Sequence, residues 1–139
     1  MRKIALDLGS RTCGFAISDE LGIIATGLDN FRFFEDNYQA VLNELTKYTK
    51  QYKIDTIILG YPLKNDGSKS QSTLRVESFK KMIEDNIDIK VVLVDEQYST
   101  KNAENILIFS GMKRKKRKQF KDKLAAQLIL EDFLTYGTR

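Results

Sequence analysis

Residues 4–18 read IALDLGSRTCGFAIS: an apolar strand that ends in a carboxylate, a turn bounded by glycines, and a second apolar strand. A carboxylate at a strand tip is costly to bury unless it pairs with a cation or coordinates a metal. Glycines allow a tight turn and let a phosphate or another strand approach the backbone closely. Asp7 is therefore the first candidate for a metal-binding catalytic residue.

The segments around this stretch predict an α/β fold. The first three strands follow one another closely, which favours an antiparallel meander, and the later strands alternate with helices, which forces parallel pairing. We therefore expect a mixed five-stranded sheet, with a three-strand antiparallel meander plus two parallel strands, flanked by helices. The strands are predicted at Lys3–Asp7, Gly14–Ser18, Ile23–Asn30, Thr56–Gly60 and Lys90–Val94.

The helices are predicted from apolar residues at helical spacing and from capping signals. The residues from Asp36 to Gln39 resemble a capping box for the first helix, and the second helix is expected to turn Leu74, Phe79, Met82 and Ile83 inward. The predicted ranges are Tyr38 to Tyr48, Ser72 or Thr73 to Asn86, Ser99 or Thr100 to Ser110 with Gly111 ending it, and Arg117 to Tyr136.

Composition indicates one domain over residues 1–139, with 42% hydrophobic and 30% charged residues. No apolar run approaches the roughly 20 residues that span a bilayer. No signal peptide precedes the first strand, so we expect a cytoplasmic location and no membrane partner.

The chain contains no histidine and a single cysteine, and this narrows the possible chemistry. Catalytic triads that need histidine, histidine general bases and histidine-bearing zinc sites are excluded. Cys13 is interpreted as a small residue at a strand start. Carboxylates remain as the main catalytic groups, and carboxylates indicate a hard cation such as Mg²⁺ or Mn²⁺.

The net charge of +4 hides a strong asymmetry. Residues 113–123 hold eight basic side chains and one acidic one, which leaves the rest of the chain at −3. Such localised charge indicates a polyanionic partner, and a run of this kind is equally typical of a solvated, flexible loop. A membrane role is disfavoured because no apolar anchor adjoins the run. The run consists of Lys113, Arg114, Lys115, Lys116, Arg117 and Lys118.

Three carboxylates from distant segments are expected to converge. Parallel strands place their carboxyl ends along one edge of the sheet, where Asp7 ends the first strand and Asp95 and Glu96 end the fifth. Successive residues point to opposite faces, so only one of those two joins Asp7. On the last helix, Asp122 shares a stripe with two alanines, Ala125 and Ala126, whose small side chains allow close packing on the sheet.

Each acid also has a plain structural interpretation. Asp122 alone is typical of a solvated charge or of the first turn of a helix, and Asp95 could serve as a helix cap. Asp7 is the hardest to explain without a function. Together, three acids without histidine are typical of a two-metal site that hydrolyses a phosphodiester.

These motifs resemble those of the YqgF (RuvX) family, which has the ribonuclease H-like fold of Holliday-junction resolvases. The family signatures D-x-G-x-x-x-x-G-x-A, G-x-P-L…D-G, D-E-R-x-[ST]-T and D-x-x-A-A occur in the family's order. They are met by Asp7, Gly9, Gly14 and Ala16; by Gly60, Pro62, Leu63, Asp66 and Gly67; by Asp95, Glu96, Ser99 and Thr100; and by Asp122, Ala125 and Ala126. Gln97 departs from the pattern, because it replaces the usual arginine.

The resemblance implies a metal-dependent nuclease for structured nucleic acid, linked to maturation of the 5′ end of 16S ribosomal RNA. Asp7, Glu96 and Asp122 correspond to the family's catalytic acids and would bind Mg²⁺ or Mn²⁺. Arg11 and the run from Lys113 to Lys118 would hold the phosphate backbone, which gives affinity without sequence specificity. Asn65, Asp66 and Ser68 lie on a loop that would flank the substrate.

Other functions remain open from the sequence. One alternative is a Holliday junction resolvase on DNA, and another is a non-catalytic nucleic-acid-binding module for ribosome assembly. An ATPase of the actin and sugar-kinase type also begins with D-x-G after a strand, but the chain is short for that class. Either a monomer or a homodimer is compatible, and cutting a two-fold-symmetric junction would favour the dimer.

Overall fold

A computed structural model covers the chain. It describes residues 1–63, 66–95, 111 and 114–137. Within the last range, only the backbone is described for residues 114–123, and side chains are described from residue 124 onward. The predicted helix over residues 99–110 lies outside the described residues, as does the substrate-loop residue Asn65.

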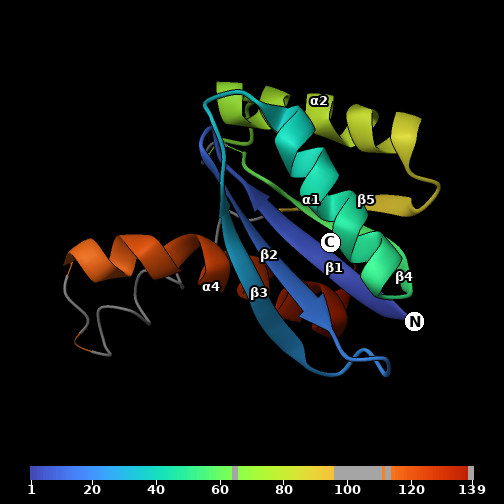
Figure 1. The fold of residues 1–139 in the computed structure, drawn as a ribbon. Coiled ribbons are helices and arrows are strands. Elements are labelled where there is room, and N and C mark those ends of the chain that lie inside the picture. The colour runs from blue at the N-terminus through green and yellow to red at the C-terminus, as the bar shows by residue number, and fades with distance from the viewer. Residues whose placement is uncertain (64–65, 96–110, 112–113, 138–139) are drawn as a thin grey trace.

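Five strands form one mixed sheet (Figure 1). Their order across the sheet is β3-β2-β1-β4-β5, with β1, β2 and β3 antiparallel and with β4 and β5 parallel to β1. The predicted mixed α/β sheet is thereby confirmed. The strands are β1 (Arg2–Leu8), β2 (Thr12–Ser18), β3 (Ala25–Arg32), β4 (Ile54–Tyr61) and β5 (Lys90–Asp95).

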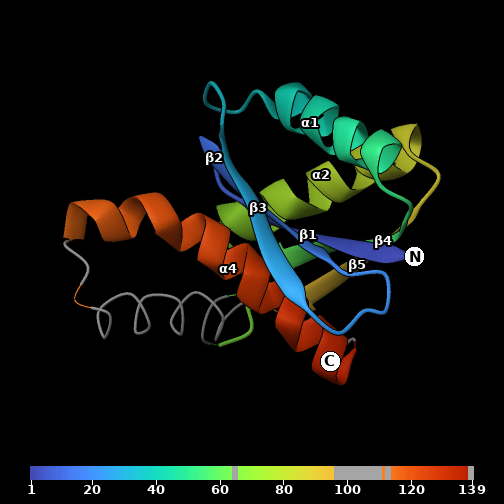
Figure 2. The same cartoon turned by 60° about the horizontal axis from the view of Figure 1, so that its bottom comes forward.

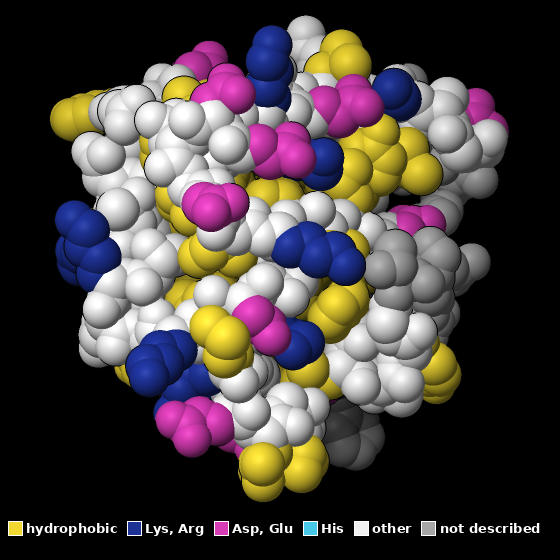
Figure 3. All heavy atoms as spheres, turned by 90° about the vertical axis from the view of Figure 1, so that its right-hand side faces the viewer, with side chains coloured by type: hydrophobic (Ala, Val, Ile, Leu, Met, Phe, Trp, Pro, Cys, Tyr) yellow, Lys and Arg dark blue, Asp and Glu magenta, His cyan; other side chains and the backbone are white. Residues whose placement is uncertain are grey.

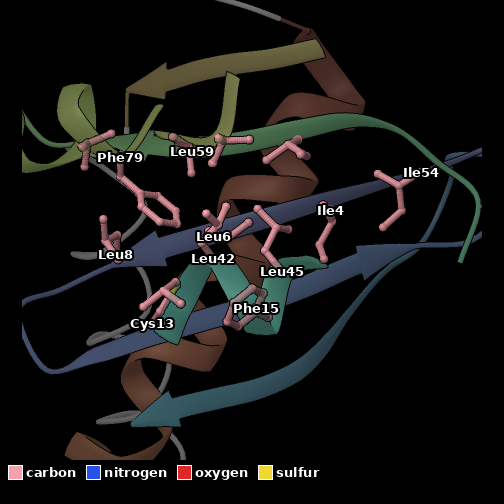
Figure 4. Close-up of a cluster of buried hydrophobic side chains, with 14 of the residues drawn as sticks. Ile4, Leu6, Leu8, Cys13, Phe15, Leu42, Leu45, Ile54, Leu59 and Phe79 are labelled. Atoms are coloured by element: carbon pink, nitrogen blue, oxygen red, sulfur yellow. The ribbon is translucent and has the colours of Figure 1, made fainter. Parts of the chain in front are cut away.

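One face of the sheet is covered by α1 (Tyr38–Gln51) and α2 (Gln71–Asn86). Alternate residues of β1 and β2 point into this layer, as the two-residue period of a strand requires. Figure 4 shows the resulting cluster, in which Phe15 and Phe79 are among the largest fully buried side chains. Cys13 is buried in the same cluster, in agreement with its structural interpretation.

The other face is covered by α4 (Arg114–Tyr136), which packs across β1, β2 and β3 (Figure 2). Small side chains meet at this contact: Ala5 and Ala16 on the sheet, and Ala125 and Ala126 on the helix, all fully buried. Ile129 and Leu130 continue the buried stripe and are also fully buried. The predicted close packing of this helix on the sheet is confirmed.

The two helix starts on the first face behave differently. At α2 the side chains of Ser70 and Thr73 cap each other's backbone amides, so the helix begins slightly earlier than predicted. The predicted capping box at Asp36 is wrong. Asp36 has a positive φ of 61° and donates its amide to the Ser10 carbonyl, 3.1 Å away, and Asn37 at the N-cap makes no side-chain cap bond. Because the chain is tied to the β1–β2 turn here, the cap geometry is lost.

Three further details differ from the sequence prediction. Strand β3 begins at Ala25, because the Asp19 carboxylate accepts the amides of Ile23 and Ile24 at 2.7 and 2.9 Å and holds them in the turn. Leu74 is exposed, since no described residue covers that side of the first turn of α2. Helix α4 begins at Arg114, earlier than the predicted Arg117. Among the described residues, no helix is both long and apolar enough to cross a membrane.

Candidate active site

The carboxyl ends of β1, β4 and β5 lie at the same edge of the sheet, because these strands are parallel. In α/β sheets such an edge is the usual place for a ligand. We call it the carboxyl edge. The turn from β1 to β2 and the end of β3 lie there too, since β2 runs antiparallel to both β1 and β3.

Asp7 is half-buried and lies on the α4 side of the sheet. Its neighbours in β1 fix this orientation: Ala5 belongs to the core under α4, whereas Leu6 belongs to the core under α1 and α2. Across the sheet, Asp7 pairs with Gly14 of β2. On the other side Leu6 pairs with Leu59 of β4, so Gly60 comes beside Asp7. Neither flanking glycine carries a side chain that could crowd the Asp7 carboxylate.

Asp95 lies on the opposite face of the sheet from Asp7. In β5, Val94 belongs to the core under α4 and Leu93 packs against the core under α1 and α2, so alternation turns Asp95 away from α4. Asp95 is also exposed. The structure therefore does not bring Asp95 to Asp7. Glu96 lies outside the described residues, and its role stays a prediction.

Helix α4 runs across the sheet toward the carboxyl edge. Its C-terminal end lies against the β2–β3 turn, where Leu134 and Thr135 line one groove with Gly22 and Ile23. That turn is at the opposite edge, because the Arg2 guanidinium at the start of β1 donates to the Ser18 carbonyl. The N-terminal direction of α4 therefore leads toward the edge that holds Asp7.

Asp122 lies on α4, one turn before the buried Ala125 and Ala126. Its side chain, like those of Arg114 to Lys118 earlier in the helix, lies outside the described residues. The backbone of this basic segment forms the first turns of α4, which project beyond the sheet in Figures 1 and 2. Lys113 precedes the helix and also lies outside the described residues.

Arg11 lies in the turn between β1 and β2, at the carboxyl edge. Its guanidinium Nη2 is 3.2 Å from Glu35 Oε2, and both side chains are exposed. Exposed ion pairs of this kind contribute little to stability, so a phosphate can replace the Glu35 carboxylate at small cost.

The loop after β4 is held by a polar network that sequence reasoning missed. Glu77 of α2 accepts hydrogen bonds from Tyr61 Oη at 3.0 Å and from Lys69 Nζ at 2.9 Å. These bonds, that from Lys69 first, lower the pKa of Glu77. In the same loop the Asp66 carboxylate accepts the Ser68 amide at 2.9 Å, and hydrogen bonds from Ser68 lower the pKa of Asp66. The described residues 66–69 of this loop are therefore fixed by hydrogen bonds, and Lys69 is held against α2.

Two further features of the site were not recognised as functional from the sequence. Gly14 and Gly60 appear in the family signatures, yet their position beside Asp7 requires the strand register. The sequence signal that was available is that Gly14 belongs to the same signature as Asp7, and that Gly60 opens the next signature along the chain. Among the residues with described side chains, no three acidic or cysteine groups lie together as a metal site.

The opposite side of the molecule has a different character. Figure 3 views the side on which the N-terminus lies, and there acidic and basic side chains alternate without a patch of one sign.

Comparisons with known proteins agree with this geometry. A family model described as "RuvX: Holliday junction resolvase" matches residues 1–136. A Mycoplasmopsis pulmonis protein named "Putative pre-16S rRNA nuclease" is 46% identical over 135 residues, which are 96% of this chain and 92% of that protein. A protein of the same name from Ureaplasma parvum serovar 3 is 48% identical over 142 residues, 97% of each chain.

A solved structure shows the same fold. T. thermophilus RuvC, in complex with Holliday junction substrate, is 13% identical and aligns with a TM-score of 0.59 over 99% of this chain and 97% of its own. The predicted ribonuclease H-like fold class is confirmed by this similarity and by the sheet order. Since the family model and both relatives match nearly the whole sequence, the chain belongs to the RuvX family.

Proposed function

We propose that this protein is a metal-dependent nuclease that hydrolyses phosphodiester bonds of structured nucleic acid and processes the 5′ end of pre-16S rRNA. The observation that carries the proposal is Asp7: a half-buried carboxylate at the carboxyl edge, flanked by Gly14 and Gly60. Membership in the RuvX family and the names of the relatives support the substrate class. We take residues 1–139 to act as one nuclease domain in the cytoplasm.

The donor set at this edge suits a hard divalent cation. Carboxylate oxygens are preferred by Mg²⁺ and Mn²⁺, and the residues directly beside Asp7 on β2 and β4 are glycines, which leave space for an ion. We assign Asp7, Glu96 and Asp122 as the residues that hold the metal. Two such cations, when bound, supply an activated water and stabilise the departing oxygen of the phosphodiester.

The orientation of Asp95 in the sheet supports the choice of Glu96 over Asp95. Because Asp95 lies on the face opposite Asp7, the residue that follows it is the better candidate. The choice of Asp122 rests on the direction of α4, whose buried Ala125 and Ala126 lie one turn further along.

The phosphate backbone would be bound by Arg11 and by the basic start of α4, from Lys113 to Lys118. Contacts of this kind position a polymer and carry no sequence information. Specificity would then come from the shape of the substrate and from contacts beside the cutting site.

Asp7→Asn tests the catalytic proposal, since it keeps the size of the side chain and removes its charge. We expect cleavage of a pre-16S rRNA 5′ fragment in Mg²⁺ or Mn²⁺ to fall by about 100-fold or more, as when a reacting group is misplaced. The matched control is Asp85→Asn on the exposed end of α2, which should cleave normally. If Asp7→Asn cleaves as fast as the unmodified protein, the mechanism is wrong.

A second candidate function is cleavage of a four-way DNA junction, which the description of the family favours. The same assay decides between the two substrates when a junction is tested beside the RNA. A junction has two-fold symmetry, so its cleavage would require two copies, whereas trimming an RNA end needs one. Light scattering of the protein with each substrate measures the number of copies.

A non-catalytic binding module would give a different result. Such a protein would bind RNA without any contribution from a metal at Asp7. Titration with Mn²⁺ therefore discriminates: divalent binding that is lost in Asp7→Asn supports the enzyme, and the same Mn²⁺ binding in both proteins contradicts it.

A further inference from the structure

An aromatic groove lies at the end of β3, outside the proposed catalytic residues. It has a volume of about 410 Å³ and is lined by Phe31, Arg32, Phe33, Phe34, Asn37 and Ala40. This volume is within the usual range for small-ligand pockets, roughly 300–1,000 Å³. Neither the RuvX signatures nor the charge pattern pointed to this groove.

Some of the aromatic rings in the groove pack against one another. Phe31 and Phe33 stack with centroids 6.2 Å apart and planes inclined by 18°, and Phe33 contacts Tyr38 of α1 at 5.9 Å. Phe34 is different, because 86% of its surface is exposed. It is the most exposed large apolar side chain among the described residues, and it lies beside rings that are already held in place.

In the plane of the sheet, the groove lies two strands from Asp7. Its stacked rings, Phe31 and Phe33, pack against the core under α1 and α2 and so lie on the face opposite Asp7, whereas Arg32 alternates with them and lies on the Asp7 face. Asp7 pairs with Gly14, and Gly14 pairs with Asn30 of β3, the residue before Phe31. Neighbouring strands are about 4.8 Å apart, so Asn30 lies about 10 Å from Asp7. Nucleotides of one strand advance about 3.4 Å each in a duplex, so the groove is a few nucleotides from the proposed cutting site.

The charges around the groove suit a nucleic-acid strand. Arg32 is exposed, alternates with the stacked Phe31 and Phe33, and makes no ion pair with any described residue. Of the two acids that follow, Asp36 accepts a hydrogen bond from Tyr38 Oη at 3.0 Å, whereas Glu35, which pairs with Arg11 in this structure, would be released when Arg11 binds a phosphate. A cation beside aromatic rings is the arrangement with which proteins bind single strands.

We infer that this aromatic groove binds an unpaired base of the substrate strand, with Phe34 stacking on the base and Arg32 contacting the adjoining phosphate. The inference rests on the proposed nuclease function and extends it. It implies that the enzyme recognises a single-stranded segment of the substrate beside the cleaved bond.

The test uses a single-stranded RNA that carries 2-aminopurine, whose fluorescence is quenched when the base stacks. Binding is measured in the Asp7→Asn background, so that the strand stays intact. We expect Phe34→Ala to abolish the quenching and to weaken binding about fivefold or more, in line with the loss of one stacked base. Phe34→Tyr should bind normally, and binding of blunt duplex RNA should be unchanged.

The control is Leu21→Ala, which removes an equally exposed apolar side chain (81%) from the turn at the opposite end of β3. This variant should bind like the parent protein. If Phe34→Leu binds and quenches as well as phenylalanine, no ring stacks on the base and the inference is overturned. It is also overturned if Phe34→Ala leaves RNA binding intact and instead abolishes self-association in light scattering, because the groove would then hold a second copy.

This binding test is separate from the cleavage test. Loss of quenching in Phe34→Ala supports the groove whatever the cleavage assay gives. Conversely, an active nuclease in which Phe34→Ala binds normally would retain the proposed function and refute the groove.

Discussion

At the scale of single residues, Asp7 shows how a sheet can present a carboxylate. Its strand partner Gly14 and its neighbour Gly60 come from separate strands, and both lack a side chain in the row that holds Asp7. Partial burial of a carboxylate has a desolvation cost, and a bound cation is one of the ways in which proteins offset it. The position of Asp7 is therefore compatible with the proposed role in binding a cation.

Tyr48 illustrates a residue with a purely structural role. Its ring packs against Phe15 of the core, with centroids 5.3 Å apart. Burial, with a further contribution from the charge of Asp29, raises the pKa of Tyr48 to about 12. The unfolded chain has the ordinary tyrosine pKa of about 10, so ionisation favours the unfolded state.

This pKa predicts a loss of stability in alkali. The contribution of Tyr48 is complete below pH 10 and is lost as the pH rises from about 10 to about 12. Urea unfolding at several pH values measures this effect. In Tyr48→Phe the free energy of unfolding should fall less steeply across that window than in the unmodified protein. Equal slopes for the two proteins would show that Tyr48 titrates alike in both states.

At the scale of elements, the small-residue contact between α4 and the sheet determines where the helix lies. Ala125 and Ala126 are fully buried, and Ala126 packs in the core with Ala5 and Ala16. Close packing of this kind leaves no room for a larger side chain. Because Asp122 lies one turn earlier on α4, the same contact sets the distance of its backbone from the sheet.

Ala126→Leu is therefore expected to destabilise the protein by about 1–3 kcal/mol, the usual cost of overpacking a core. Urea denaturation measures the change. The control is Gln127→Leu, one residue along the helix, where the parent side chain is only half-buried and more room is available. We expect cleavage by Ala126→Leu to fall as well, since the helix that carries Asp122 is displaced. Unchanged stability would mean that the contact is not tightly packed.

The elements also show which parts of the fold were predictable. Continuous apolar runs such as Thr56–Gly60 predicted buried parallel strands, and the structure has β4 there. The start of α1 was not predictable, because a link from Asp36 to Ser10, distant in sequence, overrides the local capping signal. Leu74 follows the helical period yet stays exposed, since periodicity does not say whether anything covers a first turn.

The candidate site divides in the same way. Asp7 was predictable because a lone acid ends an apolar strand. Its glycine neighbours were not, since Gly14 depends on the register of β1 with β2, and Gly60 on the register of β1 with β4, more than fifty residues away. The polar network of Tyr61, Lys69 and Glu77 was missed for a related reason, because each of its members looks like an ordinary surface residue in the sequence. The metal-binding roles of Glu96 and Asp122 stay predictions.

At the scale of the whole molecule, positive charge is gathered at one element. Residues 113–123 hold eight of the 23 basic side chains, and the rest of the chain is net negative. The helix that begins in this segment projects beyond the sheet, whereas the side seen in Figure 3 carries mixed charge. A polyanion would therefore approach the molecule from the side of α4. The rest of the chain, which is net negative, would repel a polyanion that spread over the whole surface.

This asymmetry predicts a steep dependence of RNA binding on salt. Each phosphate neutralised by a lysine contributes about −0.9 to the slope of log K against log salt on a duplex, and about −0.7 on a single strand. Replacing Lys115, Lys116 and Lys118 by glutamine should make the slope less negative by about 2 to 3 and weaken binding to all sequences alike. Binding isotherms at several salt concentrations measure both effects.

The matched control removes the same charge elsewhere. Lys50, Lys53 and Lys81 are exposed on α1, on the turn before β4 and on α2, away from α4. Replacing these three lysines by glutamine lowers the net charge by the same amount as the first triple variant. If only the overall charge mattered, both variants would change the salt slope of RNA binding equally. We expect the slope of the control to stay close to that of the unmodified protein. If the two triple variants give the same slope, the protein binds RNA through its overall charge, and the basic start of α4 has no special role.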